Sequence, residues 1–355
     1  YTEVGNSYGR FMTTVTYPYD EQTQSWTSTS SYPNTKLKPE RTKSWEVGLD
    51  ARILNDISLN LTYYRSNTYN QTFYADLSLS SGYSNIPIQS GNIMNEGLEM
   101  SLGYNKQWKD FSFNTNYTLT WNKNRVKRLA DGVYNYATGQ PIQMPELSPL
   151  TYGHTDARLI LRVGGSMGDV YGQRLLKRDL NGYILNEEGV GLAMENKETY
   201  LGSILPKMNM GWSLGFGYKG VNLGMTFTGR FGGIVISETQ SVLDAAGVSK
   251  VSADVRDAGG VQINQSKVSA QTYYQTIQGT AAYYTYSATN VRLGELSLSY
   301  TLPKKWFDNK VGMTVGLVGK NLWMIYCKAP FDPELTTSAA SNFYQGFDAY
   351  MLASR

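Results

Sequence analysis

The sequence predicts an all-β protein that forms a transmembrane antiparallel up-and-down β-barrel. Long stretches alternate between apolar and polar residues, the polar positions carry few charges, and aromatic residues lie near the ends of the apolar faces. The stretch FSFNTNYTLTW (111–121) shows all three features. Its odd positions are Phe111, Phe113, Thr115, Tyr117, Leu119 and Trp121. Because successive side chains of a strand point to opposite faces, this stretch has one largely apolar face and one uncharged polar face.

The same alternation recurs along the chain, and short connections join the alternating stretches in pairs, as in hairpins. The connections between pairs are long, at about residues 75–90, 128–157, 238–288 and 327–349. Short turns at one end and long loops at the other are typical of outer-membrane barrels, and we expect roughly ten to twelve strands, with residues 158–206 unassigned. The other alternating stretches are WEVGLDARI (45–53), ISLNLTYY (57–64), GLEMSLGY (97–104), MNMGWSLGFGY (208–218), VNLGMTFTG (221–229), GELSLSYTL (294–302) and VGMTVGLVGKN (311–321).

Strand length fits a membrane span. Residues 111–121 extend roughly 33 Å at about 3.3 Å per residue. A strand of this length tilted by about 40° rises about 25 Å, which is the height of the apolar band of a membrane barrel. Aromatic residues at its ends then correspond to the belts at the two membrane surfaces.

Composition excludes several other classes of protein. The chain has 355 residues, of which 17% are charged, and its net charge of +3 does not indicate a nucleic-acid partner. Cys327 is the only cysteine, so no internal disulfide and no cysteine-based zinc site is expected, and we expect Cys327 to lie at a strand end without a redox role. The composition suggests no cofactor.

The main alternative is a soluble β-rich binding or adhesion protein built on a sheet with one wet face. Such a protein should dissolve without detergent and carry Lys and Glu on its wet strand faces. The polar faces here consist mainly of Ser, Thr, Asn and Gly. These residues suit a water-filled lumen better than an outer surface.

Five segments resemble the C-terminal part of SusC/RagA-type TonB-dependent transporters, which are outer-membrane proteins of Bacteroidetes. The resemblance covers most of the chain, and the segments occur in the order found in the family. They are LKPERTKSWEVGLDARIL (37–54), GNIMNEGLEMSLGY (91–104), YTLTWNKNRVKRL (117–129), NVRLGELSLSYTLPKKWF (290–307) and VGKNLWMIYCKAPFDPEL (318–335).

The resemblance implies energised import of oligosaccharides or oligopeptides through a barrel of 22 strands in the outer membrane. A SusD-like surface lipoprotein would cover the long loops, and TonB–ExbB–ExbD would act through an N-terminal part not present in this sequence. We expect residues 1–355 to be the C-terminal portion of the barrel, without the plug domain and the final strand. This portion would supply wall, lumen lining and extracellular loops in contact with outer-membrane lipids.

Two groups of residues are candidates for contacts with substrate or partners. Aromatic residues in and around GTAAYYTYSATN (279–290) could stack on sugars, pack against a lipoprotein lid or form part of the rim belt. Charged residues on predicted lumen faces could contact plug or substrate, although ion pairing between strands is the simpler interpretation. The first group is Tyr273, Tyr274, Tyr283, Tyr284 and Tyr286, and the second is Glu46, Asp50, Arg52 and Glu99.

Catalytic and metal sites receive little support. His154 is the only histidine, and an outer-membrane barrel enzyme would need catalytic partners around it. In that case His154→Ala should abolish hydrolysis and leave uptake intact. We expect no enzyme activity.

Two acidic motifs could in principle bind an ion, but both are simpler to explain as turns. DLNG (179–182) resembles the start of a calcium loop, with Glu187 and Glu188 following, but Asp, Asn and Gly also favour turns. In FDPEL (331–335), Asp-Pro is likewise a turn signal. We therefore expect no metal site at either motif.

Overall fold

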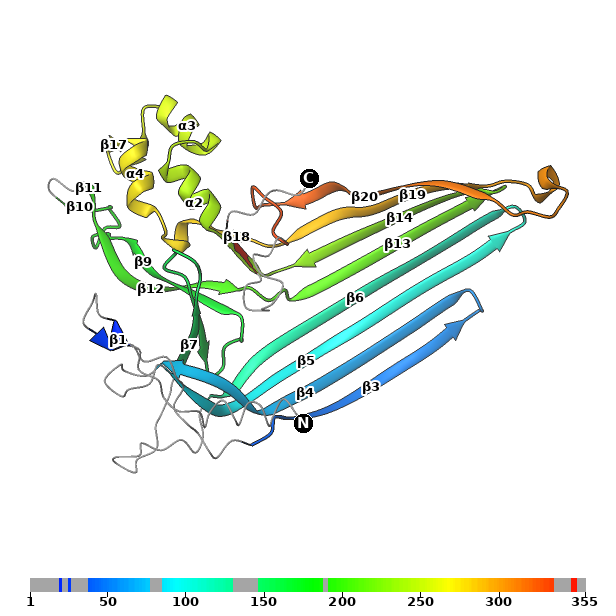
Figure 1. Cartoon of the computed structure of the whole chain (residues 1–355), viewed down its shortest axis with the longest axis horizontal. Coiled ribbons are helices and arrows are strands. Elements are labelled where there is room, and N and C mark those ends of the chain that lie inside the picture. The colour runs from blue at the N-terminus through cyan, green and yellow to red at the C-terminus, as the bar shows by residue number, and fades with distance from the viewer. Residues whose placement is uncertain are drawn as a thin grey trace.

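The computed structural model describes residues 19–20, 25–26, 38–76, 85–129, 146–187, 191–334 and 346–349. Its largest element is an eight-stranded antiparallel sheet, called the wall, in the order β20-β19-β14-β13-β6-β5-β4-β3 (Figure 1). Among the described strands, β3 and β20 each pair on one side only. The wall strands are β3 (Arg41–Ile53), β4 (Ile57–Asp76), β5 (Asn85–Trp108), β6 (Phe111–Arg128), β13 (Met208–Tyr218), β14 (Val221–Phe231), β19 (Asn290–Thr301) and β20 (Thr314–Cys327).

The strands of the wall coincide with the alternating stretches, but their number is smaller than predicted. The described wall has eight strands instead of ten to twelve. The difference lies in residues 158–206, which form no wall strand. The strand Arg158–Arg162 in this region reads RLILR and buries its three central residues. A short run that is apolar at successive positions is typical of a strand buried on both faces, and such a strand fits neither lipid nor lumen.

The register of the wall aligns like residues into rows across the strands. Leu49 pairs with Leu61, and the same row continues through Met100, Leu119 and Met210. The neighbouring row begins at Asp50 and contains Asn60, Ser101, Thr118 and Gly211. Directly opposed residues share a face, so the wall has one apolar face and one face of small polar groups. We call these the lipid face and the polar face.

Aromatic residues border the apolar band at both ends of the strands. At the end with the tight turns, the rings of Trp108 and Phe111 stack at a centroid distance of 5.7 Å. At the other end, the ring centroids of Trp45 and Tyr63 lie 5.5 Å apart. Trp121, two strands from Tyr63, lies in the same row as Tyr63. Such rings are favoured at membrane–water interfaces because one side of the ring is apolar and the other is wet. We call the two ends of the wall the turn end and the loop end.

The predicted tight turns are present at the turn end. Asn55 has φ 56°, Lys109 has φ 48°, and Lys219 and Gly220 have φ 47° and 89°. Positive φ at the centre of a two-residue turn matches the right-handed twist of the flanking strands. The connection between β19 and β20 contains the short helix η3 (Lys304–Phe307).

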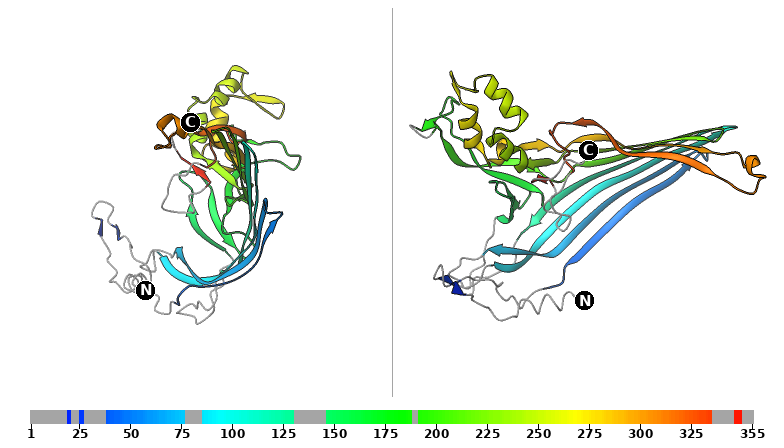
Figure 2. Two further views of the ribbon diagram at one scale, coloured as in Figure 1. Left: turned by 90° about the vertical axis from the view of Figure 1, so that its right-hand side faces the viewer. Right: turned by 45° about the horizontal axis from the view of Figure 1, so that its top comes forward.

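The long connections fold together into what we call the loop assembly, residues 146–187, 191–206, 232–289 and 346–349. It lies at the loop end of the curved wall, with its strands on the concave side (Figures 1 and 2). None of the described helices is long and apolar enough to cross a membrane. Its main elements are β7 (Glu146–Thr151), β8 (Arg158–Arg162), β9 (Asp169–Leu176), β12 (Met194–Ser203), β15 (Ile234–Ser237), α2 (Glu238–Ala245), α3 (Lys250–Asp257), α4 (Ala270–Ile277), β18 (Thr285–Ser287) and β21 (Phe347–Asp348).

The loop assembly has its own hydrophobic cores. One core joins Tyr152, Val170, Ile236 and Phe347, which come from four different parts of the chain. The second packs α4 against the end of β9. Each helix begins at a serine, Ser237, Ser249 or Ser269, whose side chain accepts a hydrogen bond from the backbone N–H three residues later. The long loops are therefore ordered by packing and capping.

Asp156 links two of these loops through its buried carboxylate. Oδ2 accepts hydrogen bonds from the backbone N–H groups of Gln173 and Arg174 at 3.2 and 2.7 Å, and Oδ1 accepts from that of Ala281 at 2.7 Å. The side chain is 7% exposed. A carboxylate that satisfies three buried donors is costly to remove, because the donors then lose their partners.

We expect Asp156→Ala to loosen the contact between the loops. Leaving these donors unpaired should lower the local free energy of opening by about 3 kcal/mol. Hydrogen exchange of the full-length protein should then show faster exchange at Arg174 and Ala281. The control is Asp254→Ala, which removes an exposed carboxylate from α3 that pairs only with Lys250. Equal exchange in both variants would contradict the role of Asp156.

Adjacent residues of β4 test the assignment of the two faces. Leu61 belongs to the lipid face and Asn60 to the polar face. We expect Leu61→Arg to destabilise the protein by about 2–4 kcal/mol, because it places a charge near the middle of the apolar band. Asn60→Arg should have a small effect. Urea titration in phosphatidylcholine vesicles measures both, and an equal loss in the two variants would refute the assignment.

Candidate functional site

The polar face of the wall and the loop assembly together form the candidate site. The four predicted lumen charges all lie on the polar face. Glu46 is opposite Tyr64, Asp50 opposite Asn60, and Arg52 opposite Ser58, while Glu99 lies between Thr62 and Thr120. None of the four forms an ion pair with another described residue. The predicted ion pairing is therefore not seen within the described wall, and contact with plug or substrate stays a prediction.

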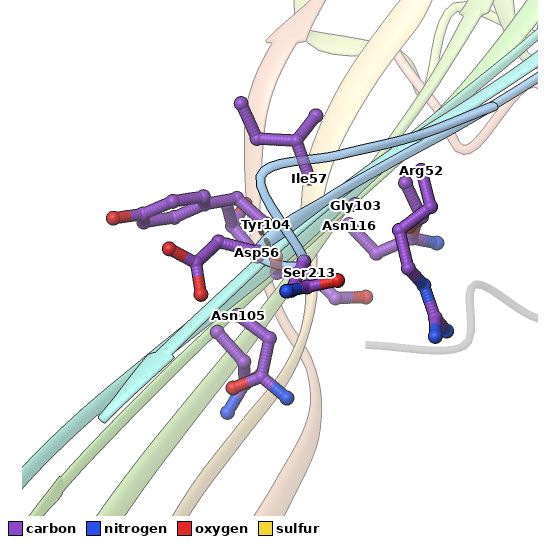
Figure 3. Close-up of a pocket in the computed structure, with 12 residues that line it drawn as sticks. Arg52, Asp56, Ile57, Gly103, Tyr104, Asn105, Asn116 and Ser213 are labelled. Carbon is purple, nitrogen blue, oxygen red and sulfur yellow. Dashed lines mark hydrogen bonds between the residues drawn. The ribbon is translucent and has the colours of Figure 1, made fainter.

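A hollow of about 360 Å³ lies near the turn end around Arg52 (Figure 3). Its lining includes Asn116 and Ser213 of the polar face. In Figure 3 Arg52 and Tyr104 extend in different directions. Gly103 keeps the hollow open, because a Cβ atom there would lie 2.5 Å from Ser58 Oγ. Chemically, the hollow offers the guanidinium of Arg52 and the carboxylate of Asp56 among uncharged hydrogen-bonding groups.

At the loop end, an ion network ties the segment after β20 to the polar face. Arg292 donates from Nη1 and Nη2 to the two carboxylate oxygens of Asp332 at 3.0 and 2.9 Å. Its Nη2 also lies 3.3 Å from Glu334 Oε2. Glu334 in turn accepts a hydrogen bond from Asn290, which is fully buried. Bidentate arginine–carboxylate pairs fix geometry as well as charge, so residues 331–334 of FDPEL are held against the wall.

FDPEL also forms the turn that its Asp-Pro pair predicts. The backbone N–H of Glu334 donates to Asp332 Oδ1 at 3.0 Å. On the next strand, Arg230 donates from Nη2 to the carbonyl of Ile204 at 2.9 Å. The chain's own loop segments therefore cover part of the polar face at the loop end.

The five predicted tyrosines belong mainly to the interior of the loop assembly. Tyr274 and Tyr284 are 7% and 3% exposed and lie in its second core, against which Tyr273 and Tyr283 pack. Tyr286 packs edge-on against Phe331 at 5.7 Å. The rim-belt interpretation is thus wrong for Tyr274 and Tyr284, because both are buried inside the loop assembly. Burial leaves Tyr274 and Tyr284 no surface for a sugar ring.

The tyrosines that remain partly exposed are Tyr273, Tyr283 and Tyr286. For these three, contact with substrate or lid stays a prediction. The Tyr283 hydroxyl accepts a hydrogen bond from the backbone N–H of Leu176 at 3.1 Å. Burial raises the pKa of Tyr273 and of Tyr286, so both side chains are neutral phenols at physiological pH.

His154 lines a cavity of about 310 Å³ together with Glu238 and Ser241. The sequence does not indicate Glu238 and Ser241, because they lie on α2 more than 80 residues from His154. Only the fold brings them to the same cavity. Ser241 Oγ accepts a hydrogen bond from the backbone N–H of Gly279 at 2.9 Å. A shared cavity wall does not by itself make a catalytic relay, which needs hydrogen bonds in series between the three groups.

The other chemical candidates form ordinary local structure. Asp179 Oδ1 accepts hydrogen bonds from the backbone N–H groups of Asn181 and Tyr183 at 2.9 and 2.8 Å, which closes a turn. Glu188 lies outside the described residues, as does the side chain of Glu187. No group of three or more His, Cys, Asp or Glu that could hold a metal ion occurs in the described part of the chain. Cys327 is the last residue of β20, as predicted.

Comparison with known proteins agrees with this architecture. Residues 4–322 match the family model described as TonB dependent receptor-like, beta-barrel. TonB-dependent receptor P3 of Formosa agariphila is 25% identical over 329 residues, which is 86% of this chain and 32% of that protein. TonB-dependent receptor SusC of Bacteroides thetaiotaomicron is 28% identical over 119 residues, which is 33% of this chain and 12% of SusC.

A solved structure shows the same fold. The structure of the RagAB peptide transporter aligns with a TM-score of 0.62 and 20% identity, over 88% of this chain and 34% of that chain. The chain thus spans about a third of the length of P3 and of the aligned RagAB chain. With the alternating wall, its aromatic belts and the family match over most of its length, the chain belongs to the TonB-dependent receptor β-barrel family of outer-membrane proteins.

Proposed function

We propose that residues 1–355 form the C-terminal portion of the barrel of a TonB-dependent transporter that imports oligosaccharides or oligopeptides. The wall carries this proposal, because one face is largely apolar and the other is lined mainly by small polar groups with a few charged side chains. Such a wall separates lipid from a hydrated passage. The strands β3 and β20 have free edges in the described sheet, and unpaired backbone groups are costly in lipid. Further strands of a longer protein would complete the barrel.

The choice between peptide and glycan rests on the relatives. The similar RagAB structure is that of a peptide transporter, which favours peptides. The polar face offers both donors and acceptors to either class, and no acidic or basic row dominates it in the described wall. We therefore propose an uncharged or weakly charged oligomer as the substrate.

The proposed partners follow from the same architecture. A SusD-like surface lipoprotein would cover the loop assembly from outside, and TonB–ExbB–ExbD would act on a part of the transporter other than this wall. The loop assembly supports the first partner, because an ordered extracellular surface can dock a protein with little entropic cost. We propose no catalytic role for the chain.

Fractionation and uptake test this function. The protein should appear in the outer membrane, require detergent for extraction, and co-purify with a lipoprotein. Cells should take up labelled oligopeptides or oligosaccharides only when both the transporter gene and TonB are intact. A soluble protein, or uptake that does not depend on TonB, would refute the proposal. Uptake should be unchanged in His154→Ala, and loss of a hydrolytic activity in that variant would instead support a barrel enzyme.

Arg52 tests whether the polar-face charges contribute to transport. We expect Arg52→Gln to lower uptake about tenfold, because a hydrogen bond to a charged group contributes roughly 1.5–3 kcal/mol. Lys305→Gln is the control, since this exposed lysine lies in η3 outside the wall. Protein levels in the outer membrane must be equal in both variants. Normal uptake by Arg52→Gln would show that the hollow around Arg52 is not part of the transport path.

A further inference from the structure

A cluster of basic side chains lies on the lipid face just beyond the aromatic belt of the loop end. The register places Trp45, Arg65, Glu96 and Lys123 in one row across β3 to β6. The next row contains Lys43, Asn67, Met94 and Arg125, and Arg41 follows on β3. Directly opposed residues share a face, so all these basic groups continue the face that carries Val47, Tyr63, Leu98 and Trp121. We call Arg41, Lys43, Arg65, Lys123 and Arg125 the basic patch.

The basic patch has a large excess of positive charge. Glu96 is the one acidic side chain in these rows, and it lies 3.9 Å from Lys123. The other four basic groups form no ion pair with any described residue. Arg41, Lys43 and Lys123 are exposed, and Arg65 and Arg125 are partly exposed. At the turn end, by contrast, Lys106 of the same face is neutralised by Asp56.

The height of the basic patch matches the headgroup layer of a bilayer. Arg65 and Lys123 lie two residues beyond the belt row of Tyr63 and Trp121. Two residues of a strand tilted by about 40° rise about 5 Å. The interfacial layer on each side of the hydrocarbon core is about 5–8 Å thick. The side chains of Arg65 and Lys123 therefore end among headgroups. Arg125 lies four residues beyond the belt row, about 10 Å, and reaches the layer only by turning its long side chain back toward the membrane.

We propose that the basic patch binds a phosphate-bearing lipid headgroup of the outer leaflet. Continuity with the lipid-facing aromatic belt identifies a lipid as the occupant, because lipids already surround this face of the wall. Arginine and lysine at the rim of a membrane protein attract anionic headgroups, and the guanidinium fork matches a phosphate in two hydrogen bonds. The patch spans four adjacent strands, so such a lipid would bridge β3 to β6 on the outside of the barrel.

Lipid retention by the purified full-length protein tests the proposal. The variant Arg65→Gln, Lys123→Gln, Arg125→Gln removes three charges and keeps a polar side chain at each position. Each basic group near an anionic surface changes affinity about fivefold, so the triple variant should bind roughly a hundredfold more weakly. The probe is lipid A titrated into nanodiscs of phosphatidylcholine that contain the protein, with bound lipid counted by native mass spectrometry.

Two controls distinguish the loss of the basic patch from a general loss of positive charge and from misfolding. The matched variant Lys304→Gln, Lys305→Gln, Lys310→Gln removes three exposed charges at the turn end and should bind lipid A like the wild type. Heat-modifiable migration on gels shows that all variants hold a folded barrel. Inorganic phosphate is the second probe. Complete displacement of lipid A by inorganic phosphate would assign the patch to free phosphate, and unchanged binding by the patch variant would overturn the proposal.

Discussion

Pairing of every backbone N–H and C=O group within the apolar band is the constraint on which the structure depends. Lipid offers no hydrogen-bond partner, so a spanning strand must be paired on both sides. Inside the wall this condition is met by unbroken antiparallel ladders, such as the one that joins β13 to β6 from Met208 to Tyr218. The described helices lie outside the band, whereas the ladder itself tolerates a bulge, since the register of β14 with β19 shifts between Thr226 and Phe227. The division into wall and loop assembly follows from this boundary.

The pairing constraint also explains how one strand can contact lipid with one face and the lumen with the other. Once the ladder fixes the register, each residue is committed to lipid or to lumen, and its neighbour is committed to the other. Leu59 and Leu61 lie on the lipid face, while Asn60 between them lies on the polar face. A substitution at Asn60 therefore leaves the lipid face unchanged. At Gly215 of β13 the choice of residue is narrower, since a Cβ there would lie 2.5 Å from the Asn114 side chain.

The wall could be predicted from the sequence because its signals are local. Alternation gives the strands, and residues that tolerate positive φ, such as Asn55 and Gly220, give the turns. The loop assembly could not be predicted in the same way. Its order depends on contacts such as Asp156 with Ala281, which are 125 residues apart. For the same reason, the sequence of residues 158–206 predicts no particular strands.

The tyrosines of the candidate site show the same limit of prediction from sequence. A cluster of Tyr near a loop end is compatible with a belt, a sugar platform or a core, and sequence alone treats these as equal. Only the packing of α4 against β9 decides that Tyr274 and Tyr284 are core residues. The sequence predicts that the four lumen charges lie on the polar face, and the structure confirms it, because the face of a strand residue follows from register. The groups that contact these charges could not be predicted, because they depend on which segments fold into the lumen.

The loops are joined to the wall at several places on the lumen side. Asn124 Oδ1 of β6 accepts a hydrogen bond from the backbone N–H of Met167, and Arg230 of β14 donates to the carbonyl of Ile204. Outside the loop assembly, Arg292 of β19 holds Asp332 and Glu334, which follow β20. Asn124, Arg230 and Arg292 all belong to the polar face, so the register of the ladder determines where the loops attach as well as which residues face lipid.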